Sequence, residues 1–303
     1  MAKLVNVGSL CIDLVYSVPA IVKAGETLAS GTRQVFAGGK GLNQSIAAAR
    51  AGAQVLHFGA VGDDGDMLLQ QLQQEGVDVS GVQRLPGPSG QAIIQVDAEG
   101  QNAIVISGGS NRQLSPQLIE QAVAQLQGDD WILLQNEVND VGEMMKQAAQ
   151  RGAKIAFNVA PPDERIFQYP IELLQLLVVN EPEAMALAKQ PSTQSAFTRL
   201  VELYPATHIV LTRGKDGLLC YDAQTRQQHE KGTFKVNAVD ETAAGDAFVG
   251  YLLASLVEGK SLPDALPEAS AAGALAVTAA GAAPSIPSAE AVRALLQAQP
   301  DAL

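Results

Sequence analysis

The sequence predicts a three-layer α/β/α fold, in which helices cover both faces of a central, mostly parallel β-sheet. Apolar strand-like runs alternate with amphipathic helical patterns through most of the 303 residues, as in sheets whose parallel strands are joined by crossover helices. An apolar fraction of 47% and 28 glycines fit a large core with many short loops. Since α/β enzymes of this length often form one domain, we expect a single domain over 1–303.

Hydrophobic periodicity predicts the individual elements. Strands are expected at 4–7, 55–60, 131–134, 154–157, 176–179, 209–211 and 218–221. Helices are expected at 42–51, 66–75, 115–127, 141–151, 181–189 and 193–203, and apolar residues at helical spacing continue from Ala247 to Leu256. Residues 234–239 alternate in a strand-like way before that last helix.

Two segments, 14–37 and 89–107, interrupt this rhythm because they are extended and rich in turn residues. Within the second, residues 92–96 and 103–106 form a hairpin pattern around Glu99 and Gly100. Extended pieces far apart in sequence can join into one sheet, so we expect a small sheet apart from the central one. Because such a sheet exposes an apolar face, we expect it to pair with a second subunit, giving a homodimer.

Charge and cysteine content limit the class of protein. A net charge of −12 argues against a nucleic-acid surface and against attraction to acidic membranes. Cys11 and Cys220 are far apart and form no C-x-x-C pair, which favours a reduced, cytoplasmic protein. The uncharged stretch 269–283 stops at Pro284, below the length that spans a bilayer. We expect small-molecule partners, with no nucleic acid and no membrane.

The stretch 240–246, Asp-Glu-Thr-Ala-Ala-Gly-Asp, carries the clearest chemical signal. Ala243, Ala244 and Gly245 are small residues before a helix, where free N–H groups form an anion site. Asp246 would repel a bound phosphate. A carboxylate is useful there if it takes the proton of a hydroxyl that attacks a phosphoryl group. The alternative is an ordinary first-turn Asp favoured by the helix dipole.

A second motif, Ala-Gly-Gly-Lys-Gly-Leu-Asn-Gln-Ser over 37–45, opens another apolar helix and alone could be an ordinary glycine turn. Together with the first motif, and with further matches in order, it resembles the ribokinase-like carbohydrate kinases, the phosphofructokinase-B family. These matches are at 59–63, 158–161, 180–183, 212–217 and 277–285. The resemblance covers essentially the whole chain, and the likeness to the ribokinases is closest.

The resemblance implies a ribokinase-like fold whose small sheet is a lid over the sugar. It implies ATP-dependent transfer of the γ-phosphoryl group to a primary hydroxyl, O5 of a ribose-like sugar. Asp246 would be the base, and the N–H groups of 243–246 would bind the phosphoryl oxygens. Kinases for fructose-type sugars, 2-keto-3-deoxygluconate or nucleosides are alternatives, as is a catalytically silent sugar-binding protein.

The resemblance also implies the sugar site. The matching positions are Cys11, Asp13, Gly39, Lys40, Gly41, Asn43 and Glu137. A carboxylate such as Asp13 can accept two hydroxyl hydrogen bonds, although Asp13 could instead cap a turn and Glu137 could be a surface loop residue. Cys11 stands where ribokinases have an Asn, and a thiol replaces an amide poorly. Alternatively, Cys11 points into the core.

For the nucleotide, the resemblance implies two further motifs. The matching positions are Asn180, Thr212, Arg213, Gly214, Lys215, Asp216 and Gly217, together with Gly245 and Asp246. Glu183 would help to bind Mg²⁺ through water, since Mg²⁺ keeps several waters. Taken alone, Asn180 and Glu183 have the spacing of a helix capping box, and 212–217 could be a plain hairpin turn.

Finally, the resemblance implies a monovalent cation, K⁺, beside the anion site. The matching positions are Asp240, Thr242, Ala276, Ala279, Gly281 and Ser285. Most of them would contribute main-chain carbonyl groups. Glu241 departs from the family, which usually has a small or hydroxyl residue there.

Overall fold

The computed structural model describes residues 2–300 and 302, so the outermost positions of the expected 1–303 domain, 1, 301 and 303, lie outside the described residues. Over this part of the chain, the main sheet has nine strands in the order β13-β12-β11-β10-β9-β8-β1-β4-β5. Their bounds are β1 (Leu4–Val7), β4 (Val55–Val61), β5 (Asp78–Arg84), β8 (Trp131–Gln135), β9 (Lys154–Asn158), β10 (Leu176–Asn180), β11 (His208–Thr212), β12 (Leu218–Asp222) and β13 (Gln227–Lys231). All neighbours pair in parallel except β12, which is antiparallel to β11 and β13.

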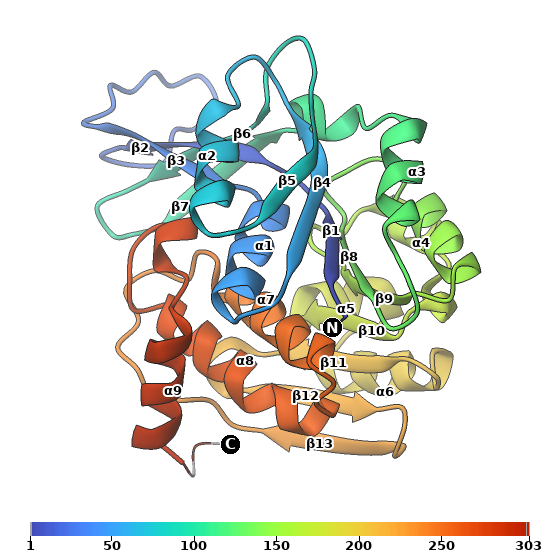
Figure 1. Ribbon diagram of the computed structural model, residues 1–303. Coiled ribbons are helices and arrows are strands. Elements are labelled where there is room, and N and C mark those ends of the chain that lie inside the picture. The colour runs from blue at the N-terminus through green and yellow to red at the C-terminus, as the bar shows by residue number, and fades with distance from the viewer. Residues whose placement is uncertain (1, 301, 303) are drawn as a thin grey trace.

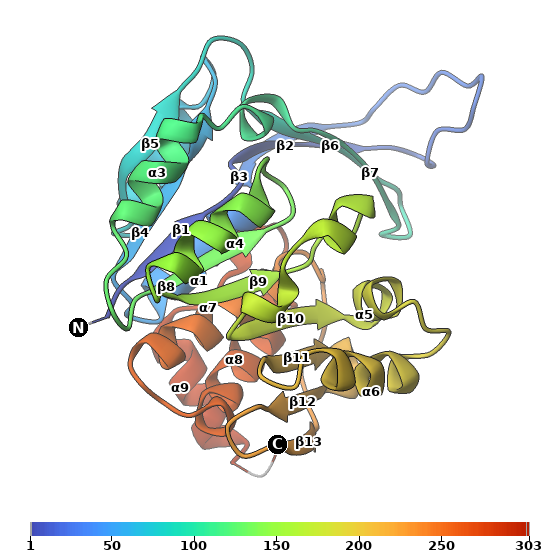
Figure 2. The ribbon, with the colours of Figure 1, turned by 90° about the vertical axis from the view of Figure 1, so that its right-hand side faces the viewer.

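Helices cover both faces of this sheet (Figures 1 and 2). One face carries α1 (Lys40–Arg50), α2 (Asp66–Gln74), α7 (Ala244–Val257), α8 (Leu262–Ala276) and α9 (Ala289–Ala298). The other face carries α3 (Pro116–Ala124), α4 (Val141–Gln150), α5 (Glu181–Ala188) and α6 (Thr193–Leu203). The expected three-layer α/β/α architecture is confirmed.

The central strands read as continuous apolar runs because both of their faces are buried. In β1, Leu4 packs into one hydrophobic cluster while Val5 and Val7 pack into the other, as the two-residue period of a strand requires. Serine side chains at the N-caps accept main-chain N–H groups at the start of α3, α6, α8 and α9, which begins these helices at defined residues.

A second, four-stranded sheet contains β2 (Cys11–Ser17), β3 (Arg33–Gly38), β6 (Gly90–Val96) and β7 (Asn102–Ser107) in the order β3-β2-β6-β7, counted over the described residues. Strands β2 and β6 pair in parallel and the outer pairs are antiparallel. Figure 2 shows this sheet extending away from the layers around the main sheet. The expected separate small sheet is confirmed, although it begins at Cys11 rather than at residue 14.

Some local predictions were wrong. Residues 234–239 form no strand, because their main-chain groups pair with loops at helix ends: Lys235 N donates to Gln299 Oε1 (3.0 Å) and Val239 N to Val277 O (2.7 Å). Strands β5 and β13 were missed because they lie at the edges of the main sheet and carry polar side chains.

Within the described residues, no helix is both long enough and apolar enough to cross a membrane. Helix α8, which contains the first half of the uncharged stretch 269–283, ends at Ala276.

Candidate active site

The two glycine- and alanine-rich motifs meet at the start of helices α1 and α7. Asn43 and Asp246 are 203 positions apart in the sequence, yet their side chains are hydrogen-bonded. The helices approach so closely that a Cβ added at Gly250 would lie 2.3 Å from that of Ala47. Glycine at 250 is therefore needed for α7 to bring Asp246 against α1.

Both carboxylate oxygens of Asp246 are held by amide groups from α1. Asn43 Nδ2 donates to Oδ2 (2.9 Å) and Gln44 Nε2 donates to Oδ1 (2.8 Å). The side chain is 8% exposed. Burial raises the pKa of Asp246, against the opposing effects of Lys40, Asn43 and Gln44. An oriented carboxylate with a raised pKa suits general-base chemistry near neutral pH.

Gln44 was not among the predicted site residues. It is fully buried, and it connects Asp246 to polar side chains at the ends of two strands: Gln44 Nε2 also donates to Asn158 Oδ1 (3.0 Å), and Gln44 Oε1 accepts from Gln135 Nε2 (2.8 Å). The available signal was the pair Asn43–Gln44 in an otherwise apolar helix, since buried polar groups need partners.

The start of α7 is open to a ligand. Ala243 has a left-handed conformation (φ 61°), and no side chain from the described part of the protein caps the helix. A Cβ added at Gly245 would meet no described atom within 4 Å. The first-turn N–H groups of a helix have no partner inside it and attract anions, so this turn can bind a phosphoryl group.

Asp13 and Glu137 are the other two acids of this region. Glu137 Oε2 accepts hydrogen bonds from Ser9 Oγ and from Lys40 N (3.1 Å). Burial, followed by the charges of Glu137 and Asp246, raises the pKa of Asp13 to about 7. Burial would lower the pKa of Lys40, but nearby carboxylates led by Asp246 and Glu137 raise it. Lys40 therefore stays charged among the acids.

Glycines let the α1 motif approach these acids. A Cβ at Gly38 would lie 2.0 Å from Asp13 Oδ2, and one at Gly41 would lie 2.4 Å from Ser9 N. Gly39, at the N-cap of α1, has φ 94°, which favours glycine. Asn43 Oδ1 is buried and has no hydrogen-bond partner among the described residues, so it is a free acceptor for a ligand hydroxyl.

Cys11 lies two residues before Asp13 on β2, so both side chains lie on the same face of the small sheet. Its buried Sγ accepts from Asn111 Nδ2 (3.4 Å). Asn111, which was not predicted, also pairs with Leu10, accepting from its N and donating to its O (both 2.9 Å). Cys11 is 5% exposed, and its contact with the sugar stays a prediction.

The residues predicted for the nucleotide line a cavity of about 980 Å³ that also reaches Lys40. They are Asn180, Glu183, Thr212, Arg213, Gly214, Lys215, Asp216, Gly217, Gly245 and Asp246. Ala243 and Ala244 join them, and apolar walls come from Phe234, Val236 and Val277, among others. The walls at 234–236 were missed because this segment had been interpreted as a strand.

Two of these motifs also form the local structures that the sequence allowed as alternatives, a helix capping box and a hairpin turn. Asn180 and Glu183 form a capping box on α5: Glu183 N donates to Asn180 Oδ1, and Asn180 N donates to Glu183 Oε2 (both 2.9 Å). Residues 213–217 turn between the antiparallel strands β11 and β12. Capping and hairpin formation place these residues at the cavity, so the local and the functional interpretations are compatible.

The positions predicted for a monovalent cation lie in the loop before α7 and in the segment from Ala276, the last residue of α8, to Ser285. Asp240 Oδ2 accepts from Gly281 N (2.9 Å), and Ser285 Oγ donates to Thr242 O (3.5 Å). Ala276 O accepts from Ala279 N (3.4 Å) in the second segment. Burial alone would raise the pKa of Asp240, but hydrogen bonds from Thr242 and Gly281 hold it below its usual value.

Another cavity, of about 610 Å³, lies at the opposite, amino ends of the strands. Trp131, Lys154 and His208 contribute to its lining, and none of the predicted site residues does. The candidate active site is therefore the one at the carboxyl ends, where ligands of open α/β sheets bind.

Comparisons with known proteins agree with this geometry. Residues 1–289 match the pfkB family of carbohydrate kinases. The chain is 35% identical to a ribokinase of Haemophilus influenzae (92% of this chain, 94% of that protein) and 32% identical to a deoxyribokinase of Salmonella typhi (94% and 95%). The structure of Arabidopsis thaliana ribokinase complexed with ribose and ATP superimposes with a TM-score of 0.85 at 28% identity (98% and 99%). The chain therefore belongs to the pfkB family of carbohydrate kinases.

Proposed function

We propose that this carbohydrate kinase transfers the γ-phosphoryl group of ATP to O5 of ribose. The observation that carries the proposal is the position of Asp246, which borders the nucleotide cavity and is held by Asn43 and Gln44. Ribokinase relatives, including one whose structure contains ribose and ATP, support ribose as the sugar.

In this mechanism, ribose is held by Asp13, Asn43 and Glu137 with O5 directed at Asp246. The carboxylate of Asp246 accepts the O5 proton while O5 attacks the γ-phosphorus. The bond from the γ-phosphorus to the bridging oxygen breaks, and ADP leaves. The first-turn N–H groups of α7 and the ammonium of Lys40 stabilise the charge on the phosphoryl oxygens.

The acidic groups at the nucleotide cavity fit a Mg²⁺ ion that has few protein ligands. Among the described residues no group of three or more His, Cys, Asp or Glu side chains could hold a metal alone. Mg²⁺ needs few protein carboxylates when phosphates and water complete its shell, and buried Glu183 borders the cavity. Bound with ATP, Mg²⁺ would neutralise phosphate charge near Glu183.

We extend the proposal to K⁺ in the loops of Asp240 and Ser285, to a homodimer through the small sheet, and to a cytoplasmic location. Both cysteines are free and buried, which suits a reducing compartment.

A second candidate sugar is 2-deoxyribose. Cys11, a weak hydrogen-bonding group, lies on the same face of β2 as Asp13, and a deoxyribokinase is among the relatives. A ribose hydroxyl that faced the thiol would lack a good hydrogen-bond partner, whereas a sugar without that hydroxyl has no such unpaired group.

The test is turnover with a panel of acceptors. The purified chain is given ATP and Mg²⁺ with ribose, 2-deoxyribose, fructose or ribonucleosides, and ADP formation and phosphorylated products are measured. We expect ribose to be converted to its 5-phosphate. Preference for fructose or a nucleoside would overturn the choice of sugar, and absence of turnover with any acceptor would overturn the enzymatic function.

A further inference from the structure

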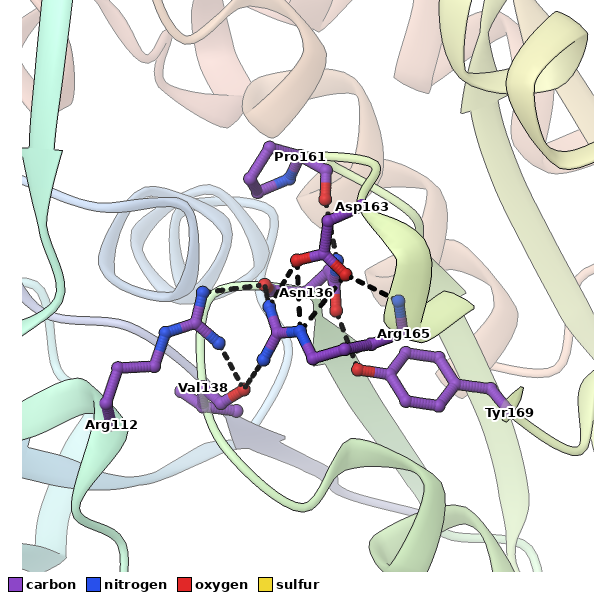
Figure 3. A network of polar contacts seen from close by, with 7 residues as sticks. All are labelled: Arg112, Asn136, Val138, Pro161, Asp163, Arg165 and Tyr169. Atoms are coloured by element: carbon purple, nitrogen blue, oxygen red, sulfur yellow. Dashed lines mark hydrogen bonds and ion pairs between the residues drawn. The ribbon is translucent and has the colours of Figure 1, made fainter. Parts of the chain in front are cut away.

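Two arginines converge on the main chain on either side of Glu137 (Figure 3). Arg112 Nη1 donates to Val138 O (2.8 Å) and its Nη2 to Asn136 O (3.4 Å). Arg165 Nη2 donates to Asn136 O (3.1 Å) and its Nη1 to Val138 O (3.4 Å). Each carbonyl therefore has one short and one long bond, and each guanidinium bridges both carbonyls.

The arrangement places two like charges side by side. Burial, followed by the charge of Arg165, lowers the pKa of Arg112. Arg165 is paired with Asp163, which accepts from its Nε (3.0 Å) and Nη2 (2.6 Å). Arg112 forms no ion pair within the described part of the chain. Its guanidinium is committed to the carbonyls that flank Glu137.

The side chain of Asn136 fixes the same segment from a third direction. Its Nδ2 donates to Pro161 O (2.7 Å), and its Oδ1 accepts from Tyr169 OH (2.8 Å). With the main chain held at 136 and 138, the intervening Glu137 is turned toward Ser9 Oγ and Lys40 N. The residues that hold this segment, Arg112, Arg165 and Asn136, are not among the predicted site residues.

We propose that Arg112 and Arg165 are positioning residues that fix Glu137 for sugar binding, an inference that rests on the proposed function. A planar guanidinium can bridge two carbonyls in a fixed geometry, which a lysine ammonium cannot. Arg112 ends the short helix η1 (Gly109–Arg112), which follows strand β7 of the small sheet. Its neighbour Asn111 holds Leu10 at the start of β2. This short helix therefore links the small sheet to both acids of the sugar site.

The test is a double-mutant cycle in the full chain. Arg112→Ala and the double variant Arg112→Ala/Arg165→Ala are each made with Glu137 and with Glu137→Gln. In the Glu137 background, we expect the ribose KM to rise about tenfold for the double variant and less for the single one, because one guanidinium still reaches both carbonyls. The ATP KM should change by less than about twofold. In the Glu137→Gln background, most of the effect on the ribose KM should disappear, because residues that act through a shared partner are not additive.

Arg199→Ala is the matched control. Arg199 is exposed and pairs with Glu202 on α6. Its loss removes one positive charge without changing a contact to residues 136–138, so the KM values for ribose and for ATP should stay unchanged. If the Ala variants fail to fold by circular dichroism, the double variant Arg112→Lys/Arg165→Lys replaces them. It keeps both positive charges and both apolar stems but removes the guanidinium groups that bridge the two carbonyls, so its ribose KM should still rise.

Three results would overturn the inference: an unchanged ribose KM in the double Ala variant, an equal fold-change with and without Glu137, or a wild-type ribose KM in Arg112→Lys/Arg165→Lys. Ribose binding, measured by calorimetry, tests the positioning of Glu137 separately from the proposed kinase function. A wild-type chain that binds ribose without phosphorylating it contradicts the function and leaves the cycle measurable through Kd.

Discussion

At the scale of single residues, the site depends on a few buried polar side chains whose charges influence one another. Asp13, Lys40, Glu137 and Asp246 share one region. Besides the effect of burial, the negative charge of Glu137 acts to raise the pKa of Asp13, of Lys40 and of Asp246. Each can therefore be tested by a substitution that keeps its size and changes only its charge or its hydrogen bonding.

Asp246→Asn should lower turnover by roughly 10²- to 10⁴-fold, the range for loss of a general base. The amide keeps the shape of the carboxylate, so the ATP KM and the thermal unfolding midpoint should stay close to the wild-type values. Initial rates with saturating ATP and ribose measure the effect. Turnover near the wild-type rate in a folded variant would contradict a base at this position.

Asp13 should make the unliganded protein less stable as pH rises. Its folded pKa of about 7 lies above its ordinary value of 3.8, so the folded chain holds a proton that the unfolded chain releases. This contribution is complete below about pH 4 and is lost as pH rises through about 7. Asp13→Asn mimics the protonated form. Between pH 5 and pH 8 the Tm of the wild type should fall by roughly 5 °C relative to that of the variant, and a constant difference would contradict the shift.

Cys11→Asn tests the choice between ribose and 2-deoxyribose. An unpaired hydroxyl in a closed site costs about 1–3 kcal/mol, so the amide should lower the KM for ribose by about 5-fold or more if a ribose hydroxyl faces Cys11. If the physiological sugar lacks that hydroxyl, the same change should instead reduce turnover of that sugar. KM values that stay unchanged for every accepted sugar would indicate that Cys11 does not touch the sugar.

At the scale of elements, the start of α7 and the neighbouring loops form one electrostatic unit. Asp240 bridges Thr242 and Gly281, so the loop before α7 and the loop after α8 are held together. An ion between them would lie beside the first-turn N–H groups where phosphoryl charge develops.

We therefore expect K⁺ to raise turnover several-fold over tetramethylammonium at fixed ionic strength and fixed Mg²⁺. Asp240→Asn should reduce that difference, because it removes the negative charge nearest the proposed ion. Steady-state rates in the two salts measure this. Equal wild-type rates in both salts would contradict a cation site in these loops.

At the scale of the whole molecule, the small sheet leaves large apolar side chains in water. Val35, Ile93, Ile104, Val105 and Ile106 are between 40% and 65% exposed. In register, Val35 and Ile93 both flank Leu14, and Ile93 lies opposite Val105. One apolar row therefore crosses the whole sheet, and an exposed apolar surface of this kind marks an interaction site.

Light scattering at micromolar concentration should give the mass of a dimer. Ile93→Lys combined with Val105→Lys should shift the mass toward a monomer, because both side chains belong to this row and their charges would have to be buried at the interface. The control is Val239→Lys, which changes an apolar side chain that is 69% exposed and outside the small sheet. A wild-type chain that is monomeric at these concentrations would contradict pairing through this sheet.

Long buried strands and most of the helices could be predicted from the sequence because their signals are local. The apolar runs of the strands and the helical spacing of apolar residues each extend over only a few residues. The sequence did not predict the edge strands β5 and β13, and it wrongly predicted a strand at 234–239. Whether such a segment forms a strand depends on which other segment lies beside it, and a local pattern does not contain that information.

Periodicity and runs of small residues predict the α/β class, the small sheet and the motif residues, because these patterns lie along the chain. Which groups act together depends on how the chain packs in three dimensions. Gln44 reaches Asp246 because Gly250 lets α7 approach α1, and Arg112 and Arg165 reach the carbonyls beside Glu137 from two separate turns. A hydrogen bond between distant residues depends on packing across the whole sheet, so no local sequence pattern predicts it.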